Sequence, residues 1–166
     1  MSTFLAIDFE TANYYRDSAC AVGLTLVQDD RVVRSEQHLI RPPSRWFTFT
    51  YIHNLTWDDV AAAPTFEELW PVLGKQLSAA DYLVAHNASF DNSVLKACCG
   101  AYNLERPNTP FLCTVQLARS QWGIYPTKLP DVCDHLDISL NHHDAGSDAA
   151  ACAQIVIEAQ RLGWSP

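Results

Sequence analysis

Two carboxylates, Asp8 and Glu10, stand two residues apart at the end of the apolar run 4–7. In a β-strand, residues i and i+2 project to the same side, so both carboxylates face one way and Phe9 faces the other. Two unpaired carboxylates this close repel each other, and each raises the pKa of its neighbour. A divalent cation such as Mg²⁺ or Mn²⁺ between them stabilises the pair, because hard cations prefer carboxylate oxygens. The pattern predicts a metal site, although on its own it also fits a solvated strand end.

Further acids and a histidine appear later in the chain, where helices are predicted to begin. Asp91 lies in "HNASFD" shortly after an apolar segment, and Asp148 lies in "HHDAGSDAA" with His143 five residues before it. Each acid alone also fits a first-turn residue favoured by the helix dipole. His143 alone also fits an exposed loop histidine. Their significance depends on whether the fold brings them to Asp8 and Glu10.

Five strands are predicted from apolar runs that end at turn residues. The first three flank a "DD" turn, and the last two are separated from them by helical patterns. The predicted strands cover residues 3–9, 19–28, 31–40, 81–86 and 110–114.

Helices are predicted from apolar residues at helical spacing and from capping signals. Thr56 can cap a short helix within 54–64, Pro64 precedes a second helix, and residues 41–51 read as a loop because two prolines interrupt pairing. The other predicted helices cover residues 89–103, 114–121, 129–136 and 145–161.

Three strands followed by alternating helices and strands predict an α/β domain with a five-stranded mixed sheet flanked by helices. The first three strands would form an antiparallel meander, and the fourth and fifth would join in parallel on the other side of strand one. Strand one would then be central, which explains its unbroken apolar character.

The segments "DFE", "NASFD" and "HDAGSDA", in this order, resemble the three motifs of the DEDDh 3′–5′ exonucleases. This is the DnaQ-like branch of the ribonuclease H-like fold, and the chain is closest in style to exonuclease X and the proofreading exonucleases. Between the first two motifs, "IHNLTWDDVAAAPTFEEL" resembles a linking segment of the same family, and the match runs over residues 4–157. Asn54 stands where the family usually has Gly, and Asn tolerates left-handed backbone angles better than most residues.

The resemblance implies a role for each candidate residue. Asp8, Glu10, Asp91 and Asp148 match the acidic ligands of two divalent metal ions, Mg²⁺ or Mn²⁺, with Asp8 bridging both. His143 matches the general base that takes a proton from the attacking water, and an ordinary histidine pKa near 6.5 suits that role.

Substrate contacts are expected on both sides of the first motif. Phe9 and Thr11 adjoin the catalytic acids, and Thr11 is expected at the terminal sugar. Ile52, His53 and Leu55 match the family segment that flanks the terminal base, where stacking needs no sequence readout. Ordinary core packing is the alternative for Ile52 and Leu55.

Composition sets limits on the function. A length of 166 residues with 48% apolar content suits one globular domain, 1–166. The net charge of −8 argues against a firm grip on long duplexes, which depends on Lys and Arg. No apolar run reaches the roughly 20 residues of a membrane span, and the N-terminus lacks a signal-peptide pattern, so a cytoplasmic location is expected. The six cysteines are expected to be reduced.

The combined interpretation is a metal-dependent 3′–5′ exonuclease that hydrolyses terminal bonds of single-stranded nucleic acid, with DNA slightly favoured, to nucleoside 5′-monophosphates. Its partners would be single-stranded or short 3′ ends, without a membrane. Alternatives are an RNA-end-trimming or oligoribonuclease-like enzyme, and a polymerase proofreading subunit, which is ranked lower because only "GWSP" follows the last predicted helix. An inactive binding module is disfavoured because all five catalytic positions are intact. Oligomeric state stays open.

Overall fold

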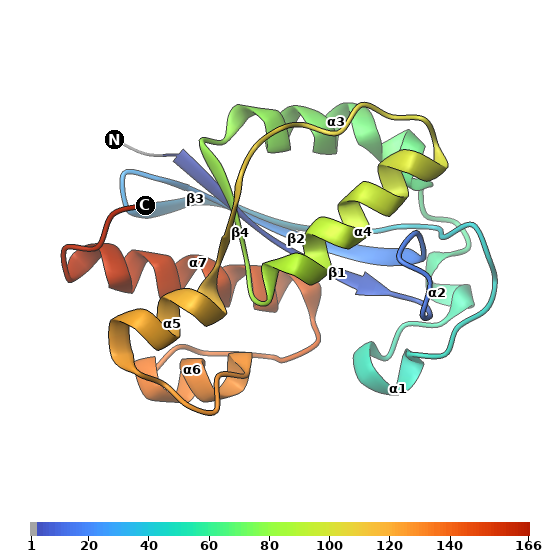
Figure 1. The fold of residues 1–166 in the computed structure, drawn as a ribbon. Helices are drawn as coiled ribbons and strands as arrows, with labels where there is room; N and C mark the ends of the chain where they lie inside the picture. Colours follow the sequence, from blue (N-terminus) through green and yellow to red (C-terminus); the bar gives the residue numbers. More distant parts are fainter. Residues whose placement is uncertain (1–2) are drawn as a thin grey trace.

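A central five-stranded sheet organises the computed structural model, which describes residues 3–166 (Figure 1). The predicted domain 1–166 includes residues 1 and 2, which lie outside the described residues. The strand order is β3-β2-β1-β4-β5, with β1 antiparallel to β2, β2 antiparallel to β3, and β1, β4 and β5 parallel. The strands are β1 (Thr3–Thr11), β2 (Ala19–Gln28), β3 (Arg31–Leu39), β4 (Tyr82–Ala85) and β5 (Phe111–Cys113). The predicted α/β class, sheet order and central first strand are confirmed.

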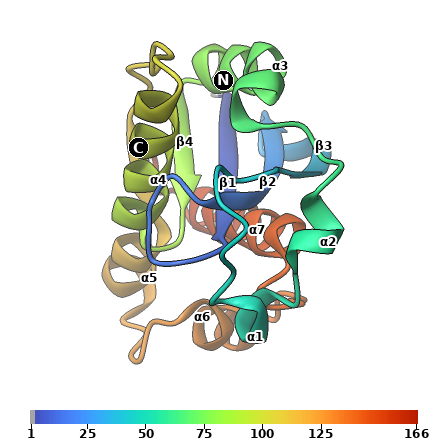
Figure 2. The same cartoon turned by 90° about the vertical axis from the view of Figure 1, so that its right-hand side faces the viewer.

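Two layers of helices cover the sheet. Helices α3 and α4 lie on one face, and α7 lies on the other together with α5 and α6 (Figures 1 and 2). The helices are α1 (Thr50–His53), α2 (Trp57–Val60), α3 (Phe66–Ala79), α4 (Ala88–Ala101), α5 (Thr114–Trp122), α6 (Leu129–Leu136) and α7 (Ala145–Arg161). None of the helices in residues 3–166 has the length and apolar character needed to cross a membrane.

The alternation of side chains along β1 creates two apolar layers. Leu5, Ile7 and Phe9 pack against α3 and α4, whereas Phe4 and Ala6 pack against α5, α6 and α7. Because β1 is buried on both faces, every position from Phe4 to Ile7 is at most 1% exposed. Polar residues can enter only where the strand leaves this double core, which is the position of Asp8.

The helix predictions are accurate except at one short turn. Thr56 caps α2 as expected, with its backbone N–H and hydroxyl donating to Asp59 at 2.7 and 2.8 Å. Residues 41–51 were expected to be a loop, but a single helical turn, α1, begins at Thr50. Asn54 closes this turn with φ 61° and ψ 5°. The expectation that Asn54 tolerates a left-handed backbone is therefore confirmed. The expected loop over 41–51 was wrong at its end, because the helical turn is closed by Asn54, which lies outside that segment.

Candidate active site

The C-terminal end of β1 extends beyond its parallel neighbour. Strand β4 pairs with β1 only from Phe4 to Ala6, whereas β2 pairs with β1 along its whole length. After Ala6, the backbone groups of β1 that face the β4 side do not pair with β4, so they can form hydrogen bonds with other groups. In sheets with parallel strands, ligands bind at this carboxyl end of the strands, where the loops and helix starts converge. Asp8 and Glu10 lie here, on the α7 side of the strand.

Asp91 reaches this end of β1 from the first turn of α4. Its Oδ1 accepts a hydrogen bond of 2.9 Å from the backbone N–H of Phe9, the residue between the two strand acids. Asp91 is 1% exposed. Burial of Asp8 is the largest cause that raises the pKa of Asp8, and the charge of Asp91 is the next largest. The residue predicted from the second motif thus lies beside the first motif. Its role as a metal ligand stays a prediction.

Asp148 arrives from the opposite face, in the first turn of α7. The N-cap residue Asp144 begins this helix and accepts a hydrogen bond of 2.8 Å from the backbone N–H of Ser147. Asp148 Oδ2 accepts from His142 Nδ1 at 3.0 Å and from the backbone N–H of His143 at 3.2 Å. The third motif therefore presents one carboxylate oxygen to its own loop and leaves Oδ1 for another partner.

Gly23 permits this close approach of α7. A Cβ built on Gly23 would lie 1.9 Å from the backbone oxygen of Ala145 at the start of α7. Gly23 pairs with Asp8 across the sheet, so any larger residue here would push α7, and Asp148 with it, away from Asp8. The role of Gly23 could not be predicted from the sequence, because a glycine within a strand pattern indicates close backbone approach without identifying the partner.

The acidic cluster is the group Asp8, Glu10, Asp91 and Asp148. One carboxylate oxygen from each of Asp8, Glu10 and Asp148 lies within 4.8 Å of the others. Asp8 Oδ2 and Asp148 Oδ1 are buried without a hydrogen-bond partner in the described residues. Unpaired buried carboxylate oxygens are costly unless a cation compensates them. The donor set, all carboxylate oxygens, fits hard divalent cations.

Burial and mutual repulsion raise the pKa of the cluster. Burial raises the pKa of Glu10 to about 8, with repulsion from Asp148 next in size. Burial also raises the pKa of Asp91 to about 7 and that of Asp8 well above its ordinary value. Without a bound cation, some of these carboxylates are therefore protonated at neutral pH. A bound divalent cation would stabilise their ionised form.

His143 is exposed on the loop before α7. Its φ of 68° places it in the left-handed region, and its ring stacks on that of His142 with centroids 3.7 Å apart. Desolvation, followed by the charge of His142, lowers the pKa of His143. A neutral imidazole at neutral pH is the form that accepts a proton. Its predicted role as general base is compatible with this placement and stays a prediction.

One wall of the site is formed by α1 and the end of β1. The backbone N–H of Leu55 donates to His53 Nδ1 at 3.0 Å, so Nε2 carries the proton and donates to the carbonyl of Thr11, also at 3.0 Å. His53 is 7% exposed, and desolvation lowers its pKa. Its two nitrogens are therefore used inside the protein. His53 holds α1 against β1, and its predicted contact with substrate does not involve a free nitrogen.

The other predicted substrate contacts differ in accessibility. Ile52 and Leu55 are half-buried, and Leu55 packs against an apolar cluster that includes Val60. Thr11 is 5% exposed. The side chain of Phe9 is 3% exposed and packs in the core, with its ring centroid 6.4 Å from that of Phe66. Strand alternation that turns Asp8 and Glu10 to the site turns the Phe9 ring away, so a contact of Phe9 with substrate would use its backbone, and this contact stays a prediction.

The opposite wall is formed by the end of β4, α5 and the loop before α6. His86 Nε2 donates to the carbonyl of Thr127 at 2.9 Å, and His86 Nδ1 lies 2.8 Å from the hydroxyl of Thr114. Desolvation is the main cause that lowers the pKa of His86. This neutral histidine fixes the loop before α6 to the end of β4, as His53 fixes α1 to β1.

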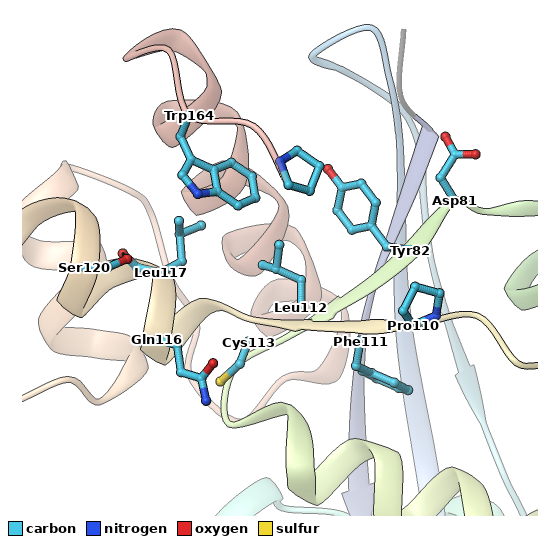
Figure 3. Close-up of a pocket in the computed structure, with 11 residues that line it drawn as sticks. Asp81, Tyr82, Pro110, Phe111, Leu112, Cys113, Gln116, Leu117, Ser120 and Trp164 are labelled. Atoms are coloured by element: carbon cyan, nitrogen blue, oxygen red, sulfur yellow. Dashed lines mark hydrogen bonds between the residues drawn. The ribbon is translucent and has the colours of Figure 1, made fainter.

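A cavity of about 540 Å³ lies along this second wall, and both Asp8 and Asp148 line it. A larger cavity, of about 640 Å³, lies at the edge strand β5 between Tyr82, Leu112 and Trp164 (Figure 3). The lining of this larger cavity includes none of the four clustered acids. The 540 Å³ cavity is therefore the candidate substrate cavity, because it lies at the carboxylates, although it is the smaller of the two.

His142 and His86 are two further histidines beside the acidic cluster. The structure gives both a defined role, because His142 hydrogen-bonds Asp148 and His86 fixes the second wall. The sequence signal for His142 was its position beside His143. The signal for His86 was absent, since its partner Thr127 is 41 residues away.

Comparisons with known proteins bear on the family of this chain. A family model described as Exonuclease (RNase_T) matches residues 5–156. Exodeoxyribonuclease 10 of Escherichia coli K12 is 30% identical over 149 residues, which cover 84% of this chain and 61% of that protein. A PolC-type DNA polymerase III of Clostridium perfringens is 32% identical over 161 residues, 92% of this chain but 11% of the polymerase. The chain thus spans about three fifths of the first relative and a small part of the second.

Solved structures show the same fold. Exonuclease X in complex with 5′-overhanging duplex DNA superposes with a TM-score of 0.79 at 25% identity, covering 98% of this chain and 94% of that one. The nuclease domain of 3′hExo, a DEDDh family member bound to rAMP, superposes with a TM-score of 0.84 at 16% identity, covering 98% and 93%. At that lower identity the second likeness bears on the fold alone.

Proposed function

Because this chain belongs to the exonuclease family, we propose that residues 1–166 form a single metal-dependent 3′–5′ exonuclease domain that releases nucleoside 5′-monophosphates from single-stranded ends. The observation that carries the proposal is the acidic cluster, in which oxygens of Asp8, Glu10 and Asp148 lie within 4.8 Å of one another and two buried oxygens lack partners. A structural cluster of acids would be paired with cations or hydrogen-bond donors. This one is instead left available to metal and substrate.

Each residue has a distinct part in the proposed reaction. Asp8, Glu10, Asp91 and Asp148 hold two divalent ions, Mg²⁺ or Mn²⁺. When bound, these ions lower the pKa of a water and offset charge on the leaving oxygen. His143 takes the proton of the attacking water, and its exposed loop lets the proton pass to solvent.

The chain also positions the substrate. Residues Thr11, Ile52 and Leu55 are proposed to hold the terminal nucleotide against the α1 wall, with Asn54 shaping the turn between them. Asp91 acts on position as well as charge, because its hydrogen bond to the Phe9 amide fixes the strand segment that carries both Asp8 and Glu10. This arrangement keeps the carboxylates in place during turnover without relying on their mutual contacts.

One panel of substrates tests the function. The protein is incubated with 5′-labelled single-stranded DNA, duplex DNA, RNA and dinucleotides, with Mg²⁺, Mn²⁺ or EDTA. We expect a ladder that shortens from the 3′ end, with DNA slightly favoured and no products in EDTA. An RNA ladder without a DNA ladder would instead identify an RNA-end-trimming enzyme. Internal cuts, or no products with either metal, would contradict the proposal.

A further inference from the structure

The 540 Å³ cavity joins the acidic cluster to two positive side chains. Its lining includes Asp8 and Asp148 at one end and Arg119 and Lys128 from α5 and the loop before α6. The whole chain has 11 Lys and Arg against 19 Asp and Glu. Two cations that share a cavity with the metal-binding acids are therefore a local exception to the charge of the protein.

Arg119 is held in a fixed orientation. Its Nε donates to the hydroxyl of Thr127 at 2.9 Å, and this hydroxyl donates to the carbonyl of Ile124 at 2.8 Å. Its guanidinium lies over the ring of Tyr125, 5.2 Å from the ring centroid. With Nε fixed, the two terminal nitrogens of Arg119 remain to bind a ligand, and a guanidinium matches the oxygens of a phosphate.

Neither cation is neutralised by a neighbouring acid. In the described part of the chain, residues 3–166, the ion pairs include neither Arg119 nor Lys128. The acid of the same loop, Asp131, accepts a hydrogen bond of 2.9 Å from the backbone N–H of Lys128 and caps α6. Both side chains are exposed and, among residues 3–166, belong to no ion pair, so each can bind an anionic group of a ligand that also reaches the acidic cluster.

The ligand follows from the two walls of the site. The α1 wall, through Ile52 and Leu55, is apolar and is proposed to hold the terminal nucleotide. The rest of the strand must then leave along the second wall, where the cavity lies. We propose that Arg119 and Lys128 bind the phosphate on the 5′ side of the scissile phosphodiester, so that this cavity is the subsite for the penultimate nucleotide. This inference rests on the proposed exonuclease function and adds the path of the strand to it.

A pair of substrates that differ by one phosphate isolates this contact. TpT offers only the scissile phosphate, whereas pTpT adds a phosphate at the position assigned to Arg119 and Lys128. For the wild-type protein we expect kcat/KM for pTpT to exceed that for TpT by roughly tenfold, the size of a charge-assisted hydrogen bond. The ribose pair UpU and pUpU is measured in parallel.

Charge removal should then lower the ratio of the two rates. Arg119→Gln and Lys128→Gln are each expected to bring the pTpT to TpT ratio close to one, and Arg119→Lys to keep part of it. Because both substrates are cut at the same acids, the ratio does not respond to a general loss of catalysis. The matched controls Arg31→Gln and Lys96→Gln remove one exposed charge outside the cavity, and they should keep the wild-type ratio.

Salt dependence gives a second readout. Binding of single strands weakens with a slope of about −0.7 per phosphate neutralised, and a chain with few basic residues at the site predicts a shallow slope of about −1 to −2 for the wild type. Because Arg119 and Lys128 bind one phosphate in this proposal, the double variant Arg119→Gln/Lys128→Gln should reduce the slope by about 0.7.

Three outcomes would overturn the subsite. They are a wild-type ratio near one, a ratio kept in both variants, and a ratio that falls equally in the controls. If wild-type protein with Mg²⁺ or Mn²⁺ cleaves neither TpT, UpU nor longer strands, the exonuclease function itself fails, and the subsite with it. Because Lys128 is exposed, its variant keeps the test valid even if Arg119→Gln perturbs the loop.

Discussion

The acidic cluster and the two histidines His53 and His86 differ in how their polar atoms are satisfied. In the cluster, Asp8 Oδ2 and Asp148 Oδ1 are buried without a partner in the described residues. At His53 and His86, each ring nitrogen has a hydrogen-bond partner within 3.0 Å. Buried polar groups are normally paired, so an unpaired set is a sign of function rather than of structure.

The difference separates residues that bind from residues that position. Burial, followed by mutual repulsion, raises the pKa of the acids in the cluster, and a divalent cation bound there would offset their charge. The histidines lose nothing when the site is empty, because their contacts with Thr11, Leu55, Thr114 and Thr127 lie within the protein. Mutations in the two sets should therefore change stability in opposite directions.

Asp8→Ala should have the largest effect on activity and should raise stability. Turnover is expected to fall by about 10³-fold or more because Asp8 is the proposed shared ligand of both ions. In EDTA, the free energy of unfolding should rise by about 1 kcal/mol, because removal of one buried acid relieves repulsion. Rates on a labelled oligonucleotide and urea unfolding measure both. Glu105→Ala, an exposed acid far from the cluster in sequence, is the control and should change neither. A lower stability of Asp8→Ala would show that the cluster is structural.

His143→Ala tests whether the loop histidines His142 and His143 take part in the reaction or only position other residues. His142 is paired with Asp148, whereas the ring nitrogens of His143 have no hydrogen bond within residues 3–166. We expect His143→Ala to lower kcat by about 10²-fold, the range for a lost general base, with little change in the Mg²⁺ concentration required. Single-turnover rates measure this, with His135→Ala as the control. A larger loss in His142→Ala than in His143→Ala would transfer the role of base to His142.

His53→Ala should change stability in the direction opposite to Asp8→Ala. The change leaves the Thr11 carbonyl and the Leu55 N–H without partners, and it should lower the free energy of unfolding by about 2 kcal/mol or more. Activity should fall mainly through a higher KM, because α1 loses its attachment to β1 while the acids stay in place. Urea unfolding and steady-state kinetics measure both effects, again with His135→Ala as the control. An effect on kcat alone would place His53 in the chemistry instead.

The two sets should also give opposite dependences of stability on pH. Glu10 and Asp91 have pKa values of about 8 and about 7 in the folded protein, above their ordinary 4.5 and 3.8. The folded state therefore holds extra protons, and the stability from these protons, full below about pH 4, is lost as pH rises through 7 and 8. His53 and His86 have lowered pKa values, so the stability they contribute is lost as pH falls below about 6.5.

Between pH 6.5 and 8.5, Glu10 and Asp91 of the folded protein pass through their pKa values, whereas the lowered pKa values of His53 and His86 keep these histidines neutral in the folded protein. We expect the metal-free protein to lose about 1 kcal/mol or more of stability over this interval. Thermal unfolding in EDTA across the interval measures the loss. Saturating Mg²⁺ should abolish it, and Asp8→Ala should make it smaller. Stability that rises with pH in EDTA would contradict the raised pKa values of the cluster.

The amino-acid sequence by itself determined the elements and their order. Apolar runs and capping residues are local signals, and they placed β2 and α7 within a residue of their observed bounds. The two-residue period of a strand also determined that Asp8 and Glu10 share a side. The same period implied that the Phe9 side chain points away, and this is confirmed by its burial in the core.

Only the tertiary structure decided how distant residues meet. Asp91 bonds the Phe9 amide 82 residues away because β4 ends early, and Gly23 admits α7 because no side chain occupies that position. Arg41 lies 3.9 Å from Glu68 and Arg45 lies over Trp57, whereas Arg119 and Lys128 line the cavity at the acidic cluster. These assignments depend on packing between segments that have no common local pattern, so neither spacing nor composition contains them.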